Sequence, residues 1–247
     1  DGEPIQRILA VGDTRAPFRF IVTAEADSAS LIEAEVAHGF DLASDDPIRT
    51  TLIELAPRDH LLLLVLHHAV ADGASIAPLL SDLARAYAAR LAGHAPDFTP
   101  LSVSYIDHAL WQRARLDDAT EAEQLAYWRT KLAALPDEID LPADRKRPAQ
   151  PSHASGAVTI AIAPDTASRL RQLAREQNAT LFMVLEATLA TLLHRLGAGD
   201  DIAIGTASGG RKDSSLDALV GLFVDTLVLR NDLSGDPDFV TLLARVR

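Results

Sequence analysis

The 247-residue chain contains no cysteine. This absence excludes disulfide bonds, a cysteine nucleophile and zinc held by cysteine, and it fits a cytoplasmic protein. The sequence also has no run of about 18 apolar residues, so we expect no membrane span. The first residues, DGEPIQRILAVGD, lack a basic region followed by an apolar block, and we therefore expect no secretory signal.

Basic residues are few relative to acidic ones. The chain has 23 lysines and arginines against 35 aspartates and glutamates, for a net charge of −12. This balance argues against a nucleic-acid partner, because the phosphate backbone attracts basic proteins. Solubility explains the charge more simply than a specific acidic docking surface. With 48% hydrophobic and 23% charged residues, the composition is that of a globular protein with one large core or two smaller ones.

The seven consecutive residues HHAVADG, at positions 67–73, carry the most chemical information. An apolar run at 61–65 leads into them, and an amphipathic stretch at 75–91 follows. The pattern predicts a buried strand, a tight turn at Gly73 and a helix. A histidine pair at the end of a strand, followed by an aspartate, is an arrangement that acyl-transfer chemistry uses.

The remaining pattern is a mixture of strands and helices, which by itself indicates only a mixed α/β fold. Alternating or short apolar runs predict further strands at residues 5–9, 18–23, 48–55, 157–162, 202–206 and 222–229. Helical spacing predicts helices at residues 28–38, 103–116, 121–135, 164–177 and 180–196, with a last one starting at Asp236. The stretch GHAPDFTP at 93–100 is the best linker candidate, because its glycine and prolines interrupt the pattern.

The two histidines are expected to differ in role. Successive side chains on a strand point to opposite faces, so His67 and His68 do not both face one cavity if the strand stays regular. The same geometry argues against a metal site, and no third ligand follows at a useful spacing. An unperturbed imidazole, with a pKa of about 6.5, suits a base at neutral pH. A lone histidine here would more simply be an interior residue with its hydrogen bonds satisfied.

The turn after the histidines has several possible functions. Asp72 either orients an imidazole, as in a catalytic triad, or holds the turn. Gly73 is predicted to need a positive φ or a close backbone approach, and in a second interpretation its N–H faces a developing oxyanion. Ser75 is predicted to be the N-cap of the following helix.

The motif HHxxxDG resembles the signature of condensation domains of nonribosomal peptide synthetases. Other segments match that family in the same order and extend the resemblance over nearly the whole chain. They are FDLASDDPIRTTLIEL at 40–55, SYIDHALWQ at 104–112, YWRTKLAALP at 127–136, LPADRKRP at 141–148, TLFMVLEATLATLLHRLGAGDDIAIGT at 180–206 and VGLFVDTLVLRNDLSGDPDF at 220–239.

The resemblance implies a two-lobed, chloramphenicol-acetyltransferase-like fold, present here in part. It places the remainder of the N-terminal lobe, with HHAVADG, at residues 1–98 and the first part of the C-terminal lobe at 99–247. The family's motif aspartate pairs with an arginine that the resemblance places in an absent segment, so Asp72 is expected to lack this partner. An incomplete C-terminal lobe is also expected to expose the apolar side chains of Phe239, Leu242 and Leu243.

The resemblance also implies roles for single residues. The reactive histidine is His68, whereas His67 and Asp72 are structural and His67 hydrogen-bonds to backbone. Gly73 is a second candidate catalytic residue through its N–H, because that group lies near the N-terminus of the following helix. Ala74, where the family often has tryptophan, Ser75, and Asp225, where it has asparagine, are expected to lie along the substrate channel. The segment GTASGGR at 205–211 lacks the proline of the family's version.

The implied reaction is peptide-bond formation between a donor acyl or peptidyl thioester and an acceptor aminoacyl thioester. No cofactor or metal is expected on this chain, since 4′-phosphopantetheine arms of partner proteins carry both substrates. The implied partners are upstream and downstream peptidyl carrier proteins and an adjacent adenylation domain. Two alternatives stay open: an epimerisation domain with the same motif, and a non-catalytic domain that binds carrier proteins or recruits other proteins.

Overall fold

The computed structural model describes every residue except 1–4, 10–16, 147 and 151–155. The chain forms two compact units. Unit 1 comprises Asp1–Arg113 and Gly209–Asp225, and unit 2 comprises Ala114–Ser208 and Thr226–Arg247. This division is not the expected boundary between residues 98 and 99, and the assignment of residues to family lobes stays a prediction.

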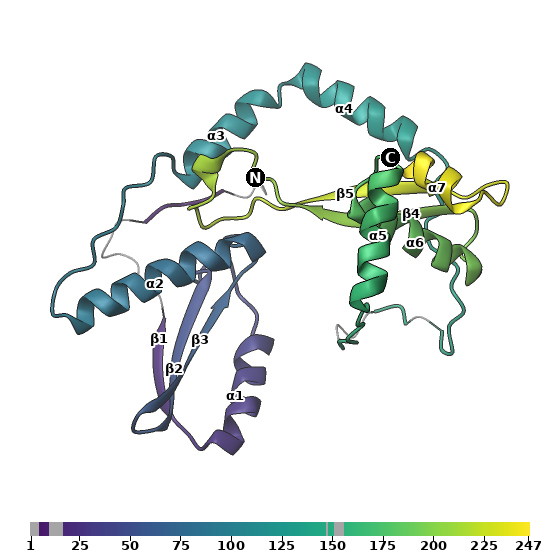
Figure 1. The fold of residues 1–247 in the computed structure, drawn as a ribbon. Coiled ribbons are helices and arrows are strands. Elements are labelled where there is room, and N and C mark those ends of the chain that lie inside the picture. The colour runs from purple at the N-terminus through teal and green to yellow at the C-terminus, as the bar shows by residue number, and fades with distance from the viewer. Residues whose placement is uncertain (1–4, 10–16, 147, 151–155) are drawn as a thin grey trace. The chain divides into compact units, whose positions relative to one another are not determined.

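Unit 1 is built on a three-stranded sheet in the order β1-β2-β3 (Figure 1). The strands are β1 (Phe18–Val22), β2 (Ile48–Ala56) and β3 (Asp59–Leu66). Helix α1 (Glu25–Ala37) connects β1 to β2, and these two strands are parallel, as expected of strands joined by a helical crossover. A two-residue turn joins β2 to β3, and this pair is antiparallel. The sheet brings the end of β3 to the histidine motif.

A buried isoleucine and an ion pair contribute to the packing of the strands and α1. Ile53, on the central strand, is fully buried. Helix α1 packs against β2 and β3. Arg19 of β1 forms an ion pair with Glu35 of α1, which is the buried residue of that helix. A paired carboxylate at this position explains why α1 can bury a charged side chain.

Two further helices and a distant segment complete unit 1. The 3₁₀ turn η1 (Gly73–Ser75) leads into α2 (Ile76–Leu91), and α3 (Tyr105–Arg115) follows. We call residues 209–225 the 209–225 segment; it contains the 3₁₀ turn η2 (Ser214–Leu216). Its apolar residues Leu216, Leu219 and Phe223 form a cluster against which Val103 and Tyr105, at and just before the start of α3, pack.

Unit 2 packs helices around a two-stranded sheet of β4 (Asp201–Ser208) and β5 (Asp225–Asp232). Its helices are α4 (Asp118–Lys131), α5 (Pro164–Glu176), α6 (Leu181–Arg195) and α7 (Phe239–Val246). Helices α5, α6 and α7 form one core with β4 and the residue after β5, and it contains Ala174, Val184, Ala187, Ala190, Ile202, Leu233, Leu242 and Leu243. Pro164 occupies the first turn of α5, where its missing N–H has no helical partner to lose.

Two predicted strands, at residues 5–9 and 157–162, do not form. Their apolar side chains are largely exposed, with Ile5 at 86%, Val158 at 88% and Ile160 at 83% of full accessibility. Neither segment has a neighbouring strand among the described residues, and an unpaired strand leaves its N–H and C=O groups without partners. Apolar alternation alone therefore overpredicted strands.

Two element boundaries near the C-terminus were also predicted wrongly. The strand expected at 222–229 begins at Asp225, because the residues just before it are hydrogen-bonded elsewhere in unit 1. The last helix starts at Phe239 rather than Asp236. Asp236 has a φ of +49°, outside the helical region, and the Asp238 carboxylate caps the helix by accepting from the Thr241 N–H at 2.7 Å.

The expected exposure of the last helix was wrong as well. Leu242 and Leu243 are buried in the core of unit 2, and Phe239 packs against it in part. Val240 of this helix is exposed, and α2 and α6 carry more exposed apolar side chains: Ile76, Leu80, Leu83, Tyr87, Leu91, Phe182, Leu185, Leu189 and Leu192. Among the described residues, none of the helices has the length and apolar character that crossing a membrane requires.

Candidate active site

The motif histidines lie at a turn that begins where β3 ends. The Val70 N–H donates to the His67 carbonyl oxygen at 3.1 Å and closes a four-residue turn at 67–70, which we call the histidine turn. The His67 N–H donates to the Pro47 carbonyl at 2.9 Å. The His67 ring contributes to the turn, since its Nδ1 accepts from the Ala69 N–H at 3.1 Å. The backbone hydrogen bond predicted for His67 is therefore present.

The His67 ring is also packed from the side. The Phe40 ring meets it edge-on, with centroids 5.8 Å apart and planes at 86°. The Arg49 guanidinium lies over Phe40, 3.8 Å from the ring centroid. Arg49 itself is bound at the end of α1, where it donates to the carbonyl oxygens of Glu35, His38 and Gly39. The side chains of His67, Phe40 and Arg49 thus connect the histidine turn, the end of α1 and β2.

His68 occupies a different environment. It is the second residue of the histidine turn and is exposed, whereas His67 is half-buried. Within the described part of the chain, the His68 ring has no hydrogen-bond partner. The alternative that His68 is an interior histidine with satisfied hydrogen bonds does not fit this position. The assignment of His68 as the reactive residue stays a prediction, but its ring is accessible to a substrate.

Asp72 is buried, and its carboxylate holds the turn into α2. Oδ1 accepts from the Ser75 N–H at 2.9 Å and lies 2.8 Å from the Ser75 hydroxyl, while Oδ2 accepts from the Phe223 N–H at 3.0 Å. No described hydrogen bond joins Asp72 to either histidine, so the geometry favours the turn-holding interpretation over a catalytic triad. Asp72, together with Ser75, forms the capping box of η1.

The same contacts keep the Asp72 carboxyl ionised. Burial raises its pKa, but the hydrogen bonds from Phe223, Ser75 and Arg211 outweigh burial and lower the pKa from 3.8 to about 2. The charge is therefore stabilised by donors on two segments that are distant in the sequence.

The expectation that Asp72 lacks an arginine partner was wrong. The Arg211 guanidinium donates to Asp72 Oδ1 at 3.3 Å, and both side chains are buried. Arg211 also donates to the carbonyl oxygens of Leu216 and Leu219 and lies over the Phe223 ring, 3.9 Å from its centroid. The 209–225 segment thus supplies the cation that neutralises the motif aspartate, a contact that spacing along the sequence does not reveal.

Ser75 precedes α2 at its N-cap, as predicted, but its side chain makes no capping bond to that helix. Its hydroxyl is fully buried and contacts Asp72, Arg211 and Gly221. This placement does not fit the expected position along a substrate channel, because a side chain without exposed surface does not reach a substrate.

The other predicted site residues are exposed. Gly73 does not have a positive φ, and a Cβ at this position would meet nothing within 4 Å. The structure therefore contradicts the expected need for glycine at the turn, while the proposed oxyanion role of the Gly73 N–H stays a prediction. Ala74 and Asp225 are exposed, and their expected positions along a channel also stay predictions.

The 209–225 segment is supported by an aromatic cluster. Tyr105 and His108 of α3 contact the Phe223 ring, with centroid separations of 5.3 and 4.8 Å. The Tyr105 hydroxyl donates to the Leu222 carbonyl at 2.8 Å. Burial raises the pKa of Tyr105, so it stays a neutral donor at physiological pH. This cluster fixes the position of Phe223 beside Arg211.

Two glycines near the site are expected to tolerate alanine very differently. A Cβ on Gly221 would lie 2.3 Å from the Tyr105 ring, whose hydroxyl is bonded to Leu222, whereas Gly73 has open space. We expect Gly221→Ala to lower the free energy of unfolding by about 1–3 kcal/mol through overpacking, and Gly73→Ala to change it by less than about 1 kcal/mol. Urea denaturation of both variants tests this difference, and equal losses would contradict it.

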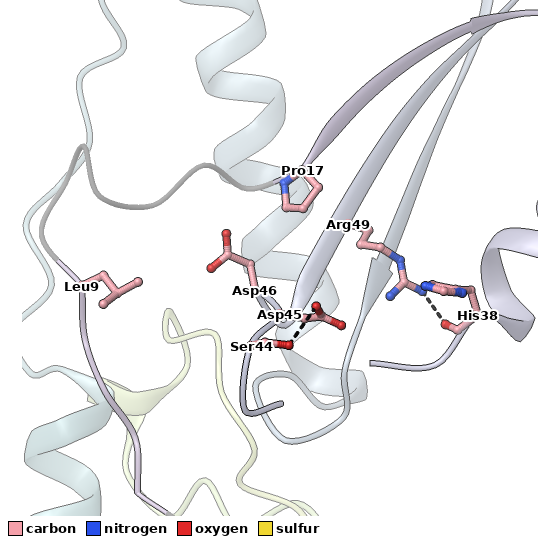
Figure 2. Close-up of a pocket in the computed structure, with 7 residues that line it drawn as sticks. All are labelled: Leu9, Pro17, His38, Ser44, Asp45, Asp46 and Arg49. Atoms are coloured by element: carbon pink, nitrogen blue, oxygen red, sulfur yellow. Dashed lines mark hydrogen bonds between the residues drawn. The ribbon is translucent and has the colours of Figure 1, made fainter. Parts of the chain in front are cut away.

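A cavity of about 520 Å³ in unit 1 lies apart from the motif (Figure 2). Its polar lining includes Ser44, Asp45, Asp46, His38 and Arg49, and neither motif histidine borders it. Figure 2 shows the Arg49 guanidinium directed toward the His38 carbonyl, one of its three bonded carbonyls. The cavity is therefore separate from the histidine turn. Across the described residues, no group of three or more histidine, cysteine, aspartate or glutamate side chains is arranged to hold a metal.

Sequence reasoning did not predict the roles of Arg211 and Phe223. Arg211 ends the GTASGGR segment, and Phe223 lies in VGLF. The sequence held one local signal, the glycine pair at 209 and 210. In the structure Gly210 has a φ of +67°, and a Cβ on it would lie 1.8 Å from the Phe223 carbonyl oxygen. The glycine pair before Arg211 indicated a close backbone approach, but not which residue approaches.

The chain matches the protein family described as "Condensation domain" over residues 1–247. It is 45% identical over 251 residues to a dimodular nonribosomal peptide synthase of Bacillus subtilis, which covers all of this chain and 11% of that protein. It is 40% identical over 252 residues to a linear gramicidin synthase polypeptide of Brevibacillus parabrevis, with all of this chain and 5% of that protein covered.

Solved structures of an X-domain and of a condensation domain are also similar to this chain. The X-domain in the complex of the X-domain and OxyB from teicoplanin biosynthesis matches with a TM-score of 0.86 and 35% identity, over 93% of this chain and 51% of that one. The first condensation domain of the calcium-dependent antibiotic synthetase matches in fold, with a TM-score of 0.67 at 22% identity and 53% of its length covered. The chain therefore spans about half the length of these structures.

These findings confirm the predicted chloramphenicol-acetyltransferase-like fold. The family match covers every residue, and the two synthetases are at least 40% identical over the whole chain. The chain therefore belongs to the condensation-domain family of nonribosomal peptide synthetases.

Proposed function

We propose that this chain is part of a domain that forms peptide bonds in nonribosomal peptide biosynthesis. The donor is an acyl or peptidyl thioester, and the acceptor is an aminoacyl thioester. Each is carried on the 4′-phosphopantetheine arm of a carrier protein, so the chain itself needs no cofactor. Its partners are upstream and downstream peptidyl carrier proteins and an adjacent adenylation domain, in the cytoplasm.

The observation that carries this proposal is the environment of His68. Its ring is exposed and has no described hydrogen-bond partner, while His67 and Asp72 beside it are engaged by backbone and by buried groups. Because His67 and Asp72 fix the turn, the His68 imidazole is exposed at a defined position. General acid–base catalysis requires such a group within hydrogen-bond reach of the reacting atoms.

In the proposed reaction the acceptor α-amine attacks the donor carbonyl carbon. A C–N bond forms and the C–S bond breaks, and the leaving thiolate takes up a proton equivalent to the one that the amine loses. His68 accepts or directs the amine proton, and the Gly73 N–H is a donor for the developing oxyanion. Aminolysis of a thioester has a favourable free energy. Most of the rate enhancement therefore comes from holding the two substrates close together in the reactive orientation.

A second candidate function is protein docking without catalysis. The likeness to an X-domain that was solved in complex with OxyB favours it. The presence of His68 favours catalysis, because a docking surface has no need of a free imidazole at this turn. Epimerisation at the donor α-carbon is a third possibility, but the segment LVGLFVDTLVLR at 219–230 resembles the condensation form more closely.

Loaded carrier proteins distinguish these functions in one experiment. A donor carrier with an acyl group and an acceptor carrier with an amino acid are mixed with the protein in D₂O, and products are followed by mass spectrometry. We expect a condensed product on the acceptor carrier. Deuterium incorporation at the donor α-carbon without condensation would indicate epimerisation. A stable complex with neither reaction would indicate a docking domain.

The 247-residue chain is expected to be slower in this assay than a polypeptide of the length of the solved domains. It spans 51% of the X-domain chain, and positioning is the larger part of the proposed catalysis. The longer polypeptide is the matched control. Equal rates for the two would contradict the prediction that residues outside this chain help to position the substrates.

A further inference from the structure

The Ser75 hydroxyl is the most densely bonded side-chain group near the histidine turn. It is fully buried. It lies 2.8 Å from Asp72 Oδ1 and 2.9 Å from the Gly221 carbonyl oxygen, both of which are acceptors. It is approached by three donors: the Gly221 N–H at 3.1 Å, Arg211 at 3.0 Å and the Asp72 N–H at 3.3 Å.

These contacts exceed what one hydroxyl can satisfy at once. A serine hydroxyl has one proton to donate and two lone pairs to accept with. The proton is shared between two acceptors and the lone pairs between three donors. Asp72 and Arg211 have further partners, whereas the Gly221 N–H and carbonyl are described as bonded to Ser75. Removing the oxygen would leave buried Gly221 groups without a described partner, which costs more than the loss of an ordinary exposed hydrogen bond.

Three consecutive residues of the 209–225 segment are bonded to side chains of the rest of unit 1. The Gly221 N–H and carbonyl bond to Ser75, the Leu222 carbonyl accepts from Tyr105, and the Phe223 N–H donates to Asp72. These bonds replace the sheet pairing that begins only at Asp225. Asp72, the N-cap of η1, and Ser75, its last residue, bind the segment on the two sides of Leu222.

We propose that Ser75 is a positioning residue that fixes the 209–225 segment against the histidine turn. This inference rests on the proposed function, because it assigns Ser75 to the alignment of His68 with Asp225 and its neighbouring residues during amide formation. Ser75 does not touch substrate. It acts through Gly221, and its removal shifts the segment while the Asp72 bond to Phe223 stays in place.

The structural part of the proposal is tested by amide hydrogen exchange on the protein without substrates. In Ser75→Ala, exchange at Gly221 is expected to accelerate at least about tenfold, because its N–H loses its acceptor. Exchange at Phe223 is expected to change much less, because Asp72 still accepts from it. Ser75→Thr keeps the hydroxyl and is expected to keep Gly221 protected. Ser214→Ala, an exposed serine in the same segment, is the matched control and should alter neither amide.

The catalytic part is tested with loaded carrier proteins and the full synthetase polypeptide. Ser75→Ala is expected to lower kcat about 10- to 100-fold with KM for both carriers nearly unchanged, as misplacement of reacting groups does. Ser75→Thr should restore much of kcat. A loss confined to melting temperature, with kcat of the folded protein intact, would reduce Ser75 to a structural role and overturn the catalytic part.

The two measurements separate this inference from the proposed function. Unchanged exchange at Gly221 in Ser75→Ala overturns the inference whether or not the protein makes amides. A wild-type protein that forms no condensed product overturns the proposed function, and with it the catalytic part, while exchange still decides whether Ser75 holds the segment. If Ser75→Ala does not fold, Ser75→Cys replaces it in both measurements, because a thiol fills the site but is a weak hydrogen-bond partner.

Discussion

Replacing His68 with alanine is expected to lower the rate of amide formation by about 10²- to 10⁴-fold, which is typical of a lost general acid–base group. The exposed ring has no described structural contact to lose, so the melting temperature should stay close to that of the wild type. The measurement is single-turnover product formation between loaded carrier proteins, in a polypeptide of full domain length, with circular dichroism to confirm folding.

His67→Ala is the matched control for this prediction. The His67 ring accepts from the Ala69 N–H and packs against Phe40, so its loss should lower the melting temperature more than the activity of the folded fraction. A folded His68→Ala protein that retains full product formation would overturn the assignment of His68. Wild-type stability in His67→Ala, with a large loss of rate, would indicate that the two histidines have exchanged roles.

Replacing Asp72 with asparagine is expected to destabilise the fold by about 3–5 kcal/mol, the range seen when one partner of a buried ion pair is removed. The Arg211 guanidinium would keep its charge in a buried site. The asparagine NH₂ would also face at least one of the donors that the carboxylate now accepts from, which are the Ser75 and Phe223 N–H groups and Arg211. Urea denaturation at neutral pH measures the loss.

The same ion pair predicts a pH dependence. The pKa of Asp72 is lowered from 3.8 to about 2 in the folded protein, so the folded state binds this proton less readily than the unfolded state. Its stabilising contribution, about 2 kcal/mol, is complete above the unfolded pKa near 4 and is lost as the pH falls toward 2. Between pH 4 and 2 the wild type should therefore lose more stability than Asp72→Asn does.

Asp107→Asn provides a control for this second prediction. Asp107 is an exposed carboxylate whose pKa is lowered by its hydrogen bonds with the side chain and backbone of Ser104, and it has no described arginine partner. Its replacement should cost less than that of Asp72. A wild-type melting temperature in Asp72→Asn together with a large loss of rate would contradict the structural role and indicate that Asp72 takes part in proton transfer.

The sequence was sufficient where a feature depends on neighbouring residues. The alternation in residues 48–55 predicted β2 to within one residue, and helical spacing predicted α5 and α6 to within one residue at each end. Periodicity works here because one buried face repeats at the period of the element itself. The motif HHAVADG likewise indicated a strand followed by a turn and a helix, but β3 is only partly buried and ends at Leu66. The two histidines therefore lie in a turn and not on the regular buried strand that was predicted.

Only the tertiary structure decided which residues surround the motif. Arg211 lies 139 residues from Asp72, and Gly221 lies 146 residues from Ser75. Nothing in local spacing encodes such pairs, because they depend on how the 209–225 segment returns to unit 1. The same contacts explain why β5 starts at Asp225 and not at the predicted residue 222, since the preceding backbone groups are bonded to Ser75, Tyr105 and Asp72. The sequence by itself determined most of the helices and strands and the place of the histidine motif, whereas long-range hydrogen bonds to buried side chains determined what holds that motif in place.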